Sequence, residues 1–152
     1  MSGFWRFAGG CLSIVLPVVG LLEMLQPSVV RGASMLPALH DGDRIVVERF
    51  TPLFGALSRG DIVVLRPPSQ DDERYVKRIA ALPGDVVRME KGALWIGGDR
   101  VLFCEADRNL THTWVIPEGH CFVLGDNTER SFDSRLFGPV PMSRVIGRVL
   151  GS

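Results

Sequence analysis

Two residues of this sequence, Ser34 and Lys77, could act together as a nucleophile and its base. A hydroxyl is a weak nucleophile until a base removes its proton, and a lysine can be that base if apolar burial lowers its pKa toward neutrality. Lys77 is flanked by Val76 and Ile79, which favours such burial. Serine and lysine form a recognised alternative to the catalytic triad. Chance pairs of this kind are common, so the pair needs support from the rest of the chain.

Other nucleophile arrangements fit this sequence poorly. The histidines, His40, His112 and His120, have neither a metal-ligand spacing nor an Asp and a Ser in a triad arrangement. The run GASML has Leu36 where the nucleophile elbow G-x-S-x-G requires a second glycine. Cys121 lies in the strand-like run HCFVLGD, where we expect it to pack as a small apolar residue. The serine and lysine are therefore the residues that the fold must position.

The segment before the serine is apolar. Residues 7–22 carry no charge, and sixteen helical residues span about 24 Å. Continuing past Glu23 brings the segment near the roughly 20 residues that a bilayer requires. We therefore expect a short cytoplasmic N-terminus at 1–6, a transmembrane anchor at 7–27 and a catalytic domain at 28–152. A cleaved signal peptide is the alternative, but no A-x-A site follows the run.

The remainder of the chain has a β pattern. Strand-like runs with β-branched residues begin at Asp43, Asp61, Arg74 and Asp85, and ALWIGGDRVL from Ala93 predicts a hairpin. Gly-Asp dipeptides recur beside the expected strands, at Gly42, Gly60, Gly84, Gly98 and Gly125. Turn dipeptides repeated between strands are typical of an antiparallel sheet with tight turns. The fold class we expect is mainly β, a folded-over antiparallel β-barrel or sandwich preceded by one transmembrane helix.

Composition excludes several classes. The chain has 152 residues, and seventeen basic residues balance seventeen acidic ones, so no global basic field is available to bind nucleic acid. The 17 glycines and 10 prolines disfavour a helical bundle. Three cysteines, Cys11, Cys104 and Cys121, are too few and scattered for a disulfide scaffold, and at most Cys104 and Cys121 could pair.

The order of four sequence blocks supports the pairing of Ser34 with Lys77. After the apolar run come SMLPAL, RGDIVVLR, YVKRIAALPGD and GDNTERSFDSRLFGPVP. In sequence and spacing the chain resembles the type I signal peptidases, Ser-Lys membrane proteases of bacteria with relatives in the mitochondrial inner membrane and thylakoid. The resemblance covers about residues 28–149. It implies a membrane-anchored serine endopeptidase that removes signal peptides from translocated pre-proteins, with no metal or cofactor.

The resemblance also implies roles for particular residues. Ser34 would be the nucleophile and Lys77 the general base, and Ser131 matches the serine that hydrogen-bonds and orients the lysine. The charged residues that pair beneath the site in this family match Arg78, Asp126, Asp133 and Arg135. Some family members place a serine hydroxyl two positions before the nucleophile, where this chain has Gly32. The backbone N–H of Ser34 would therefore stabilise the oxyanion without that hydroxyl.

Substrate preference should follow from the walls of the cleft. By family position Val30, Met35, Val64 and Val76 would line it, although any of them could instead simply fill the core. A pre-protein segment could add as an extended strand beside the strand leading to Lys77 and the strand that follows the anchor. Branched walls leave small pockets, so we expect small residues at the first and third positions before the cut.

Alternatives remain for the cellular location and for the function. We expect a single-pass protein of the bacterial plasma membrane with its catalytic domain on the outer face and the lipid bilayer as a partner. A mitochondrial inner-membrane peptidase would use the same mechanism at a different address. A self-cleaving regulator of the repressor type would carry a DNA-binding domain instead of an anchor, and a catalytically silent binding module would not need Ser34, Lys77 and Ser131. The sequence does not predict the oligomeric state.

Overall fold

The structure of the protein is a computed structural model, which describes residues 24–151 apart from residues 56, 69–70 and 105–108. Its strands are β1 (Leu25–Val29), β2 (Arg44–Glu48), β3 (Ile62–Leu65), β4 (Tyr75–Ala81), β5 (Val86–Glu90), β6 (Ala93–Ile96), β7 (Asp99–Phe103), β8 (Thr111–Val115), β9 (His120–Leu124), β10 (Val140–Pro141) and β11 (Val145–Leu150). Short helical turns join some of them: α2 (Phe50–Leu53), η2 (Thr128–Arg130), α3 (Ser134–Phe137) and η3 (Met142–Arg144).

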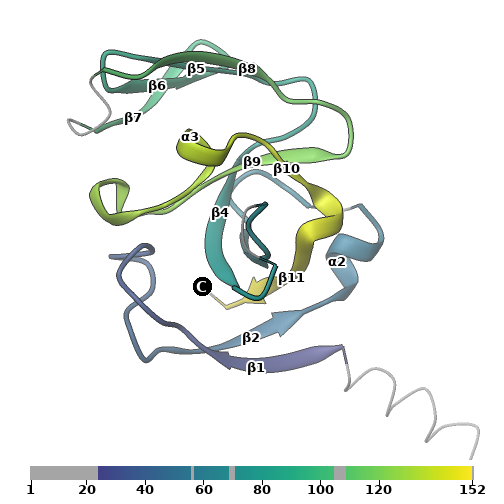
Figure 1. Ribbon diagram of the computed structural model, residues 1–152. Coiled ribbons are helices and arrows are strands. Elements are labelled where there is room, and N and C mark those ends of the chain that lie inside the picture. Colours follow the sequence, from purple (N-terminus) through teal and green to yellow (C-terminus); the bar gives the residue numbers. More distant parts are fainter. Residues whose placement is uncertain (1–23, 56, 69–70, 105–108, 152) are drawn as a thin grey trace, which may run out of the picture.

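The strands form two sheets (Figure 1). The larger has seven strands in the order β1-β2-β11-β3-β4-β9-β10, and the smaller has four in the order β7-β6-β5-β8. The strand pairs are antiparallel, and the expected hairpin from Ala93 is present as β6 and β7. The prediction of a mainly β, antiparallel fold is therefore confirmed, and the four strand-like runs correspond to β2, β3, β4 and β5.

The barrel form of that prediction is wrong, because the larger sheet curls without closing (Figure 1). The outer edge of β1 has no partner strand among the described residues. β4 pairs with β9 only from Arg78 to Ala81, so its first residues, Tyr75 to Lys77, pair on one side with β3 alone. The gap between these two edges is where a barrel would have closed, and it holds the site described below.

Three of the Gly-Asp turns share one geometry. At Gly60 the φ angle is 92°, and the carboxylate of Asp61 accepts a hydrogen bond from the N–H of Ser58 at 2.8 Å. The turns at Asp43 and Asp85 repeat this arrangement, each carboxylate accepting from the N–H three residues earlier, at 2.7 and 2.8 Å. The glycine supplies a left-handed conformation that other residues adopt at a cost, so each dipeptide fixes the start of the next strand.

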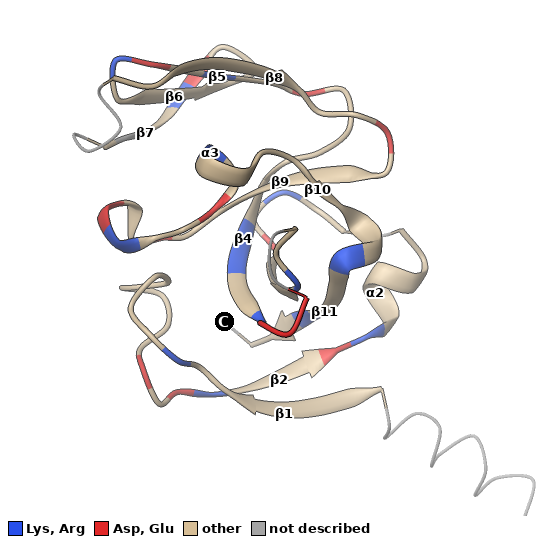
Figure 2. Cartoon of the chain, viewed as in Figure 1, with Lys and Arg blue, Asp and Glu red and all other residues tan. Residues whose placement is uncertain are grey.

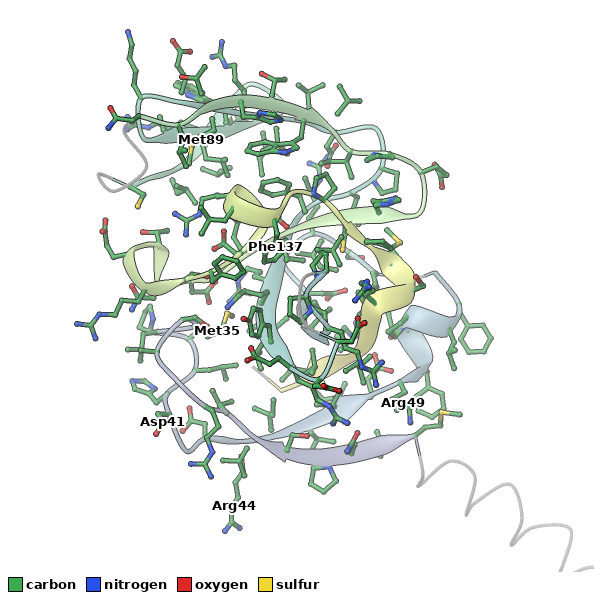
Figure 3. All side chains as sticks on the ribbon, in the orientation of Figure 1. Met35, Asp41, Arg44, Arg49, Met89 and Phe137 are labelled. Carbon is green, nitrogen blue, oxygen red and sulfur yellow. The ribbon has the colours of Figure 1, made fainter. Side chains whose placement is uncertain are left out.

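The apolar core has separate clusters beside the larger and the smaller sheet (Figure 3). Met35, 1% exposed, belongs to the cluster beneath β1, β2 and β3, and Met89, 0% exposed, belongs to the cluster between the small sheet and β9. Cys104 and Cys121 are both buried and do not form a disulfide with each other. Burial raises the pKa of the Cys121 thiol to about 12, which agrees with a packing role.

The expected anchor lies mostly outside the described residues. Its last part does not continue the apolar segment: Leu25 to Pro27 belong to β1, where they pair with Glu48 to Val46 of β2. A strand after the anchor was expected, but its start was assigned to the anchor because Met24 and Leu25 extend the apolar run beyond Glu23. Within the part of the chain that the structure describes, no helix has the length and apolar character needed to cross a membrane.

Candidate active site

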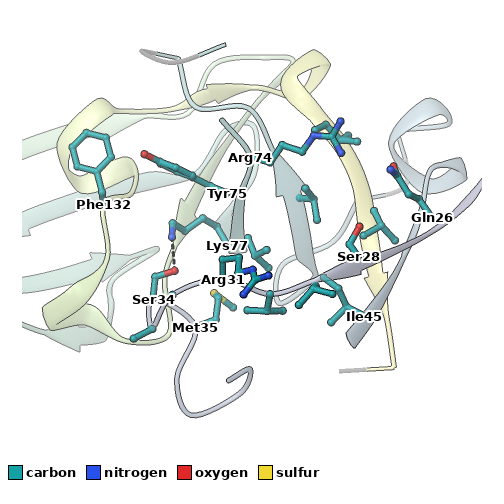
Figure 4. A pocket seen from close by; sticks show the side chains of 18 of the residues that line it. Gln26, Ser28, Arg31, Ser34, Met35, Ile45, Arg74, Tyr75, Lys77 and Phe132 are labelled. Atoms are coloured by element: carbon teal, nitrogen blue, oxygen red, sulfur yellow. Dashed lines mark hydrogen bonds between the residues drawn. The ribbon is translucent and has the colours of Figure 1, made fainter. Parts of the chain in front are cut away.

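The structure brings Ser34 and Lys77 into contact although 43 positions separate them (Figure 4). Ser34 lies in the turn that follows β1, and Lys77 is the third residue of β4. The Nζ atom of Lys77 donates a hydrogen bond to Oγ of Ser34 at 2.8 Å. In the neutral form of the amine the same contact would let the hydroxyl donate to nitrogen, which is the direction that activates a nucleophile.

Burial governs the pKa of Lys77. Lys77 is only 3% exposed. It lies on β4 next to Arg78, and blue marks basic residues on that strand in Figure 2. Removal of an ammonium from water disfavours the charged form. The carboxylate of Asp133 acts in the opposite direction and the guanidinium of Arg135 in the same direction as burial, and the pKa of Lys77 falls from 10.5 to about 8.

The loop after β9 holds the backbone around Ser34. The N–H of Asn127 donates to the carbonyl of Ser34 at 2.9 Å, and its side-chain amide donates to the carbonyl of Ala33 at 3.0 Å. Gly125 lies directly beneath this contact: a Cβ there would be 2.5 Å from the carbonyl oxygen of Ser34 and closer still to Oγ of Ser131. Two chain segments can therefore approach this closely only because residue 125 has no side chain.

Asp133 and Arg135 form a buried ion pair under that loop. Their side chains are 0% and 3% exposed, and Nε of Arg135 donates to the Asp133 carboxylate at 2.9 Å. The carboxylate also accepts from the N–H of Gly125 at 3.0 Å, and the guanidinium donates to the carbonyl of Thr128 at 2.9 Å. A buried pair with several additional hydrogen bonds rigidifies its surroundings. Its place under Gly125 makes it a support for the backbone that contacts Ser34.

Arg78 and Asp126 form the second expected pair. Two parallel hydrogen bonds join them, Nε to Oδ1 at 2.8 Å and Nη2 to Oδ2 at 2.7 Å. Arg78 also donates to the carbonyl of Gly60, which links β4 to the turn before β3. Their side chains are 36% and 18% exposed, so this pair is more exposed to solvent than the Asp133–Arg135 pair.

Ser131 does not make the contact that the family resemblance implied. Its Oγ atom is buried and has no hydrogen-bond partner among the described residues, so its hydroxyl does not hold the Lys77 amine in this structure. The hydroxyl lies instead against the position where Gly125 lacks a side chain. An unsatisfied buried hydroxyl costs about 1–3 kcal/mol. The predicted role of Ser131 therefore needs a rotation of its side chain.

A cleft of about 600 Å³ opens beside the pair. The four residues expected to shape substrate pockets, Val30, Met35, Val64 and Val76, all line it together with Ser34 and Lys77. Three of the four are less than 10% exposed and Val76 packs against the same core cluster, so they also belong to the core. The two expected roles, lining the cleft and filling the core, are therefore compatible, because the same layer of side chains has both.

Three residues of the site were missed by sequence reasoning: Tyr75, Phe132 and Asn127. The Tyr75 ring lies 5.3 Å from Nζ of Lys77, and Phe132 packs edge-on against that ring at 6.4 Å. Only Asn127 had a signal, since it belongs to the GDN block. The two aromatic residues have no spacing that indicates the contact. No group of three or more His, Cys, Asp or Glu side chains that could hold a metal occurs within the described residues.

Comparison with known proteins gives the family to which the chain is similar. Residues 6–151 match the family model described as signal peptidase, peptidase S26. Signal peptidase I of Bacillus licheniformis is 35% identical over 150 residues, which cover 90% of this chain and 80% of that protein. The mitochondrial ATP-independent inner membrane protease subunit 1b of Arabidopsis thaliana is 38% identical over 120 residues, covering 78% of this chain and 64% of that protein. A crystal structure of a signal peptidase I from Enterococcus faecalis V583 has 34% sequence identity and a TM-score of 0.49, covering 62% of this chain and 97% of that one.

Proposed function

The chain belongs to the signal peptidase family, peptidase S26, and we propose that it is a serine endopeptidase that cleaves signal peptides from pre-proteins with Ser34 as nucleophile and Lys77 as general base. The observation that carries this assignment is the 2.8 Å contact between Oγ of Ser34 and a lysine amine with a lowered pKa. The contact lies on a cleft that is open to solvent and whose lining includes the apolar side chains of Val30, Val64 and Val76.

Catalysis starts when the neutral Lys77 amine accepts the proton of the Ser34 hydroxyl. The serine oxygen forms a bond to the scissile carbonyl carbon, and the carbonyl oxygen takes up the negative charge. Collapse of this intermediate breaks the peptide bond, and Lys77 returns the proton to the leaving amine. A water molecule then releases the acyl group, with the lysine acting again as base.

Stabilisation of the oxyanion falls to the backbone. The side chain and N–H of Asn127 hold the carbonyls of Ala33 and Ser34, which fixes the peptide plane between those two residues. The N–H of Ser34 points away from the carbonyl of Ala33 in that plane. A preorganised N–H of this kind stabilises developing charge without reorganisation cost. Asn127 therefore serves as a positioning residue for the oxyanion donor.

The substrate fits as an added strand. β1 and the first residues of β4 border the cleft on opposite sides. Each strand has an edge that pairs with no neighbouring strand there among the described residues, so an extended peptide can add beside both. Side chains before the cut then point at Val30, Met35, Val64 and Val76. These walls leave room for small residues at the first and third positions before the cut.

Residues 7–22 act as the membrane anchor in this proposal. The domain begins immediately after them, because the carbonyl of Met24 accepts a hydrogen bond from the N–H of Arg49 at 3.0 Å. The active site is then held near the bilayer, where pre-proteins are retained by their own apolar segments. The address is the bacterial plasma membrane with the domain on its outer face, and the mitochondrial inner membrane is the alternative because of the plant relative.

The direct test of this function is cleavage of a pre-protein by the detergent-solubilised full chain, followed by N-terminal sequencing of the product. We expect a single new N-terminus after a small residue and none with Ser34→Ala. Deletion of residues 2–23 tests the anchor and leaves β1 intact. That variant should still cleave soluble peptides but lose efficiency on pre-protein inserted in vesicles. Equal relative efficiency on both substrates would exclude an anchoring role for the deleted segment.

A further inference from the structure

The substrate cleft carries a local excess of positive charge. Three arginines, Arg31, Arg74 and Arg130, line it together with Lys77, and no Asp or Glu is among the described residues that line it. The whole chain is neutral, with 17 basic and 17 acidic residues, so this excess is a property of the cleft alone. Low-dielectric walls focus such a field on whatever occupies the cleft.

These arginines are not paired with acids nearby. None of the three forms an ion pair with a described residue within 4.0 Å, whereas Arg59, Arg78, Arg135, Arg144 and Arg148 elsewhere in the chain all do. Glu73 adjoins Arg74 in sequence, but its carboxylate accepts a hydrogen bond from Tyr75. The three guanidiniums thus remain available to a ligand, and all three side chains are exposed.

Arg31 and Arg74 come from different segments that border the cleft. Arg31 comes directly after Val30, beyond the end of β1, and Arg74 directly precedes β4, so the two belong to opposite sides of the gap that an added strand would fill. In Figure 4, Ser34 and Phe132 lie at one end of the cleft, and Arg74 lies toward the end lined by Gln26. At about 3.3 Å per residue, β1 from Val29 back to Gln26 accommodates roughly three further residues of an extended peptide.

From these observations we infer that Arg31, Arg74 and Arg130 form a cationic subsite, which favours substrates with a carboxylate side chain within about seven residues before the cut and disfavours lysine or arginine there. This inference rests on the proposed function, because it takes the cleft to be the signal-peptide site. Exposed charge pairs contribute little individually, so each arginine should change the preference by about two- to fivefold. Anionic lipid headgroups would be attracted by the same chemistry, but the arginines share their cleft with the Ser34–Lys77 pair.

The experiment separates binding from cleavage. Ser34→Ala protein in a neutral, lipid-free detergent is titrated calorimetrically with uncleaved peptides that differ only in Glu, Gln or Lys, placed in turn at the second and the fourth to seventh positions before the cut. We expect the Glu peptide to bind about tenfold more tightly than the Lys peptide at one or more positions, with Gln between them. This ratio should shrink as salt increases, because the arginines are exposed.

Variants identify the residues responsible. In the Ser34→Ala background, Arg31→Gln, Arg74→Gln and Arg130→Gln should each lower the Glu-to-Lys ratio about two- to fivefold, and the ratio is insensitive to a general loss of affinity. Arg100→Gln, an exposed arginine on β7 of the small sheet, is the matched control and should leave it unchanged. Equal affinities at every position, or a ratio that survives all three substitutions, would overturn the inference. So would an effect of the arginines seen only with anionic vesicles, which would assign them to lipid.

Cleavage by the unmodified chain then tests the proposed function separately. If the Gln peptide is cut and the Glu peptide binds preferentially, both the peptidase assignment and the cationic subsite stand. If the Glu peptide binds preferentially but no peptide is cut by the unmodified chain, the cationic subsite stands as a binding site and the peptidase assignment fails. If the Gln peptide is cut but charge has no effect on binding, the peptidase assignment stands and the cationic subsite is refuted.

Discussion

The two sheets of this protein differ in whether they bury charged side chains, and its two lysines show the difference. Lys77, on β4 of the larger sheet, is 3% exposed and has a pKa lowered to about 8. Lys91, in the turn between β5 and β6 of the smaller sheet, is exposed. Among the described residues, the buried polar and charged ones all lie outside the small sheet: Glu48, Lys77, Asp133, Ser134 and Arg135. The cluster under the small sheet is apolar.

This contrast indicates which part of the molecule is less stable because it buries a reactive group. Burial of an amine costs free energy in the folded state, and the cost is borne where the amine contacts Ser34. The small sheet has no such groups in its core and packs through Phe122 and Leu124 of β9. It therefore supports β9, whose following loop contacts the nucleophile, without contributing reactive groups. Five predictions test this division of roles.

The largest effect should come from the catalytic pair. We expect Ser34→Ala and Lys77→Met each to lower kcat/KM at least a thousandfold, with the double variant no worse than either single one, because the residues act as one proton-transfer unit. Lys91→Met is the matched control and should stay within twofold. Peptide cleavage by each purified variant gives these values, and substantial activity in either single variant would refute the assignment.

The same lysine substitution should raise stability. The pKa of Lys77 is lower in the folded chain than its usual 10.5, so the charged amine destabilises the fold below about pH 8, and this penalty disappears as the pH rises through 10.5. Lys77→Met should therefore increase the unfolding free energy at pH 7 by about 1–3 kcal/mol. Urea unfolding of both lysine variants measures this difference, and Lys91→Met should show no comparable gain.

Gly125→Ala should have the next largest effect on activity. The added methyl would overlap the carbonyl of Ser34 and the hydroxyl of Ser131, so the loop must move away from the nucleophile. We expect kcat to fall about a hundredfold, as for other small displacements of reacting groups. Gly97→Asn, in the β6–β7 turn where φ is 61°, is the control because asparagine tolerates that left-handed conformation. Similar losses in both variants would indicate general misfolding, and far-UV circular dichroism would detect it.

The pH dependence should give a change of about tenfold per unit. Only the neutral amine accepts the proton of Ser34, so kcat/KM should rise with pH up to about 8 and level off above it. A peptide without ionisable groups between pH 5 and 10 isolates this titration. A rate independent of pH between 6 and 8 would show that the lysine is not the base.

The smallest effect on activity is expected from the small sheet. Leu94→Ala removes a side chain that is 0% exposed and should lower the unfolding free energy by about 2–5 kcal/mol. Activity per folded molecule should nevertheless remain within about twofold of the unmodified chain at low temperature. A large loss of kcat in fully folded protein would show that this sheet also shapes the active site, which would remove the division proposed above.

Much of the fold could be read from local patterns. The β-branched runs predicted β2 to β5, and the Gly-Asp dipeptides predicted turns because glycine and aspartate each satisfy a local requirement of backbone angle and hydrogen bonding. The start of β1 was misplaced because the apolar run continues into it, and only pairing with β2 shows that Leu25 to Pro27 belong to the strand. The open edge of the larger sheet was also missed, since closure depends on how far β9 follows β4.

For the site, the sequence by itself determined which side chains could do chemistry, because residue type and block order identify Ser34, Lys77 and the charged pairs around them. Only the tertiary structure decided how they meet. The burial of Lys77, the approach allowed by Gly125 and the unbonded hydroxyl of Ser131 depend on segments far apart in the chain. The arginines of the cleft likewise have no common motif. Contacts between distant segments are set by packing, and packing distances are not encoded in local periodicity.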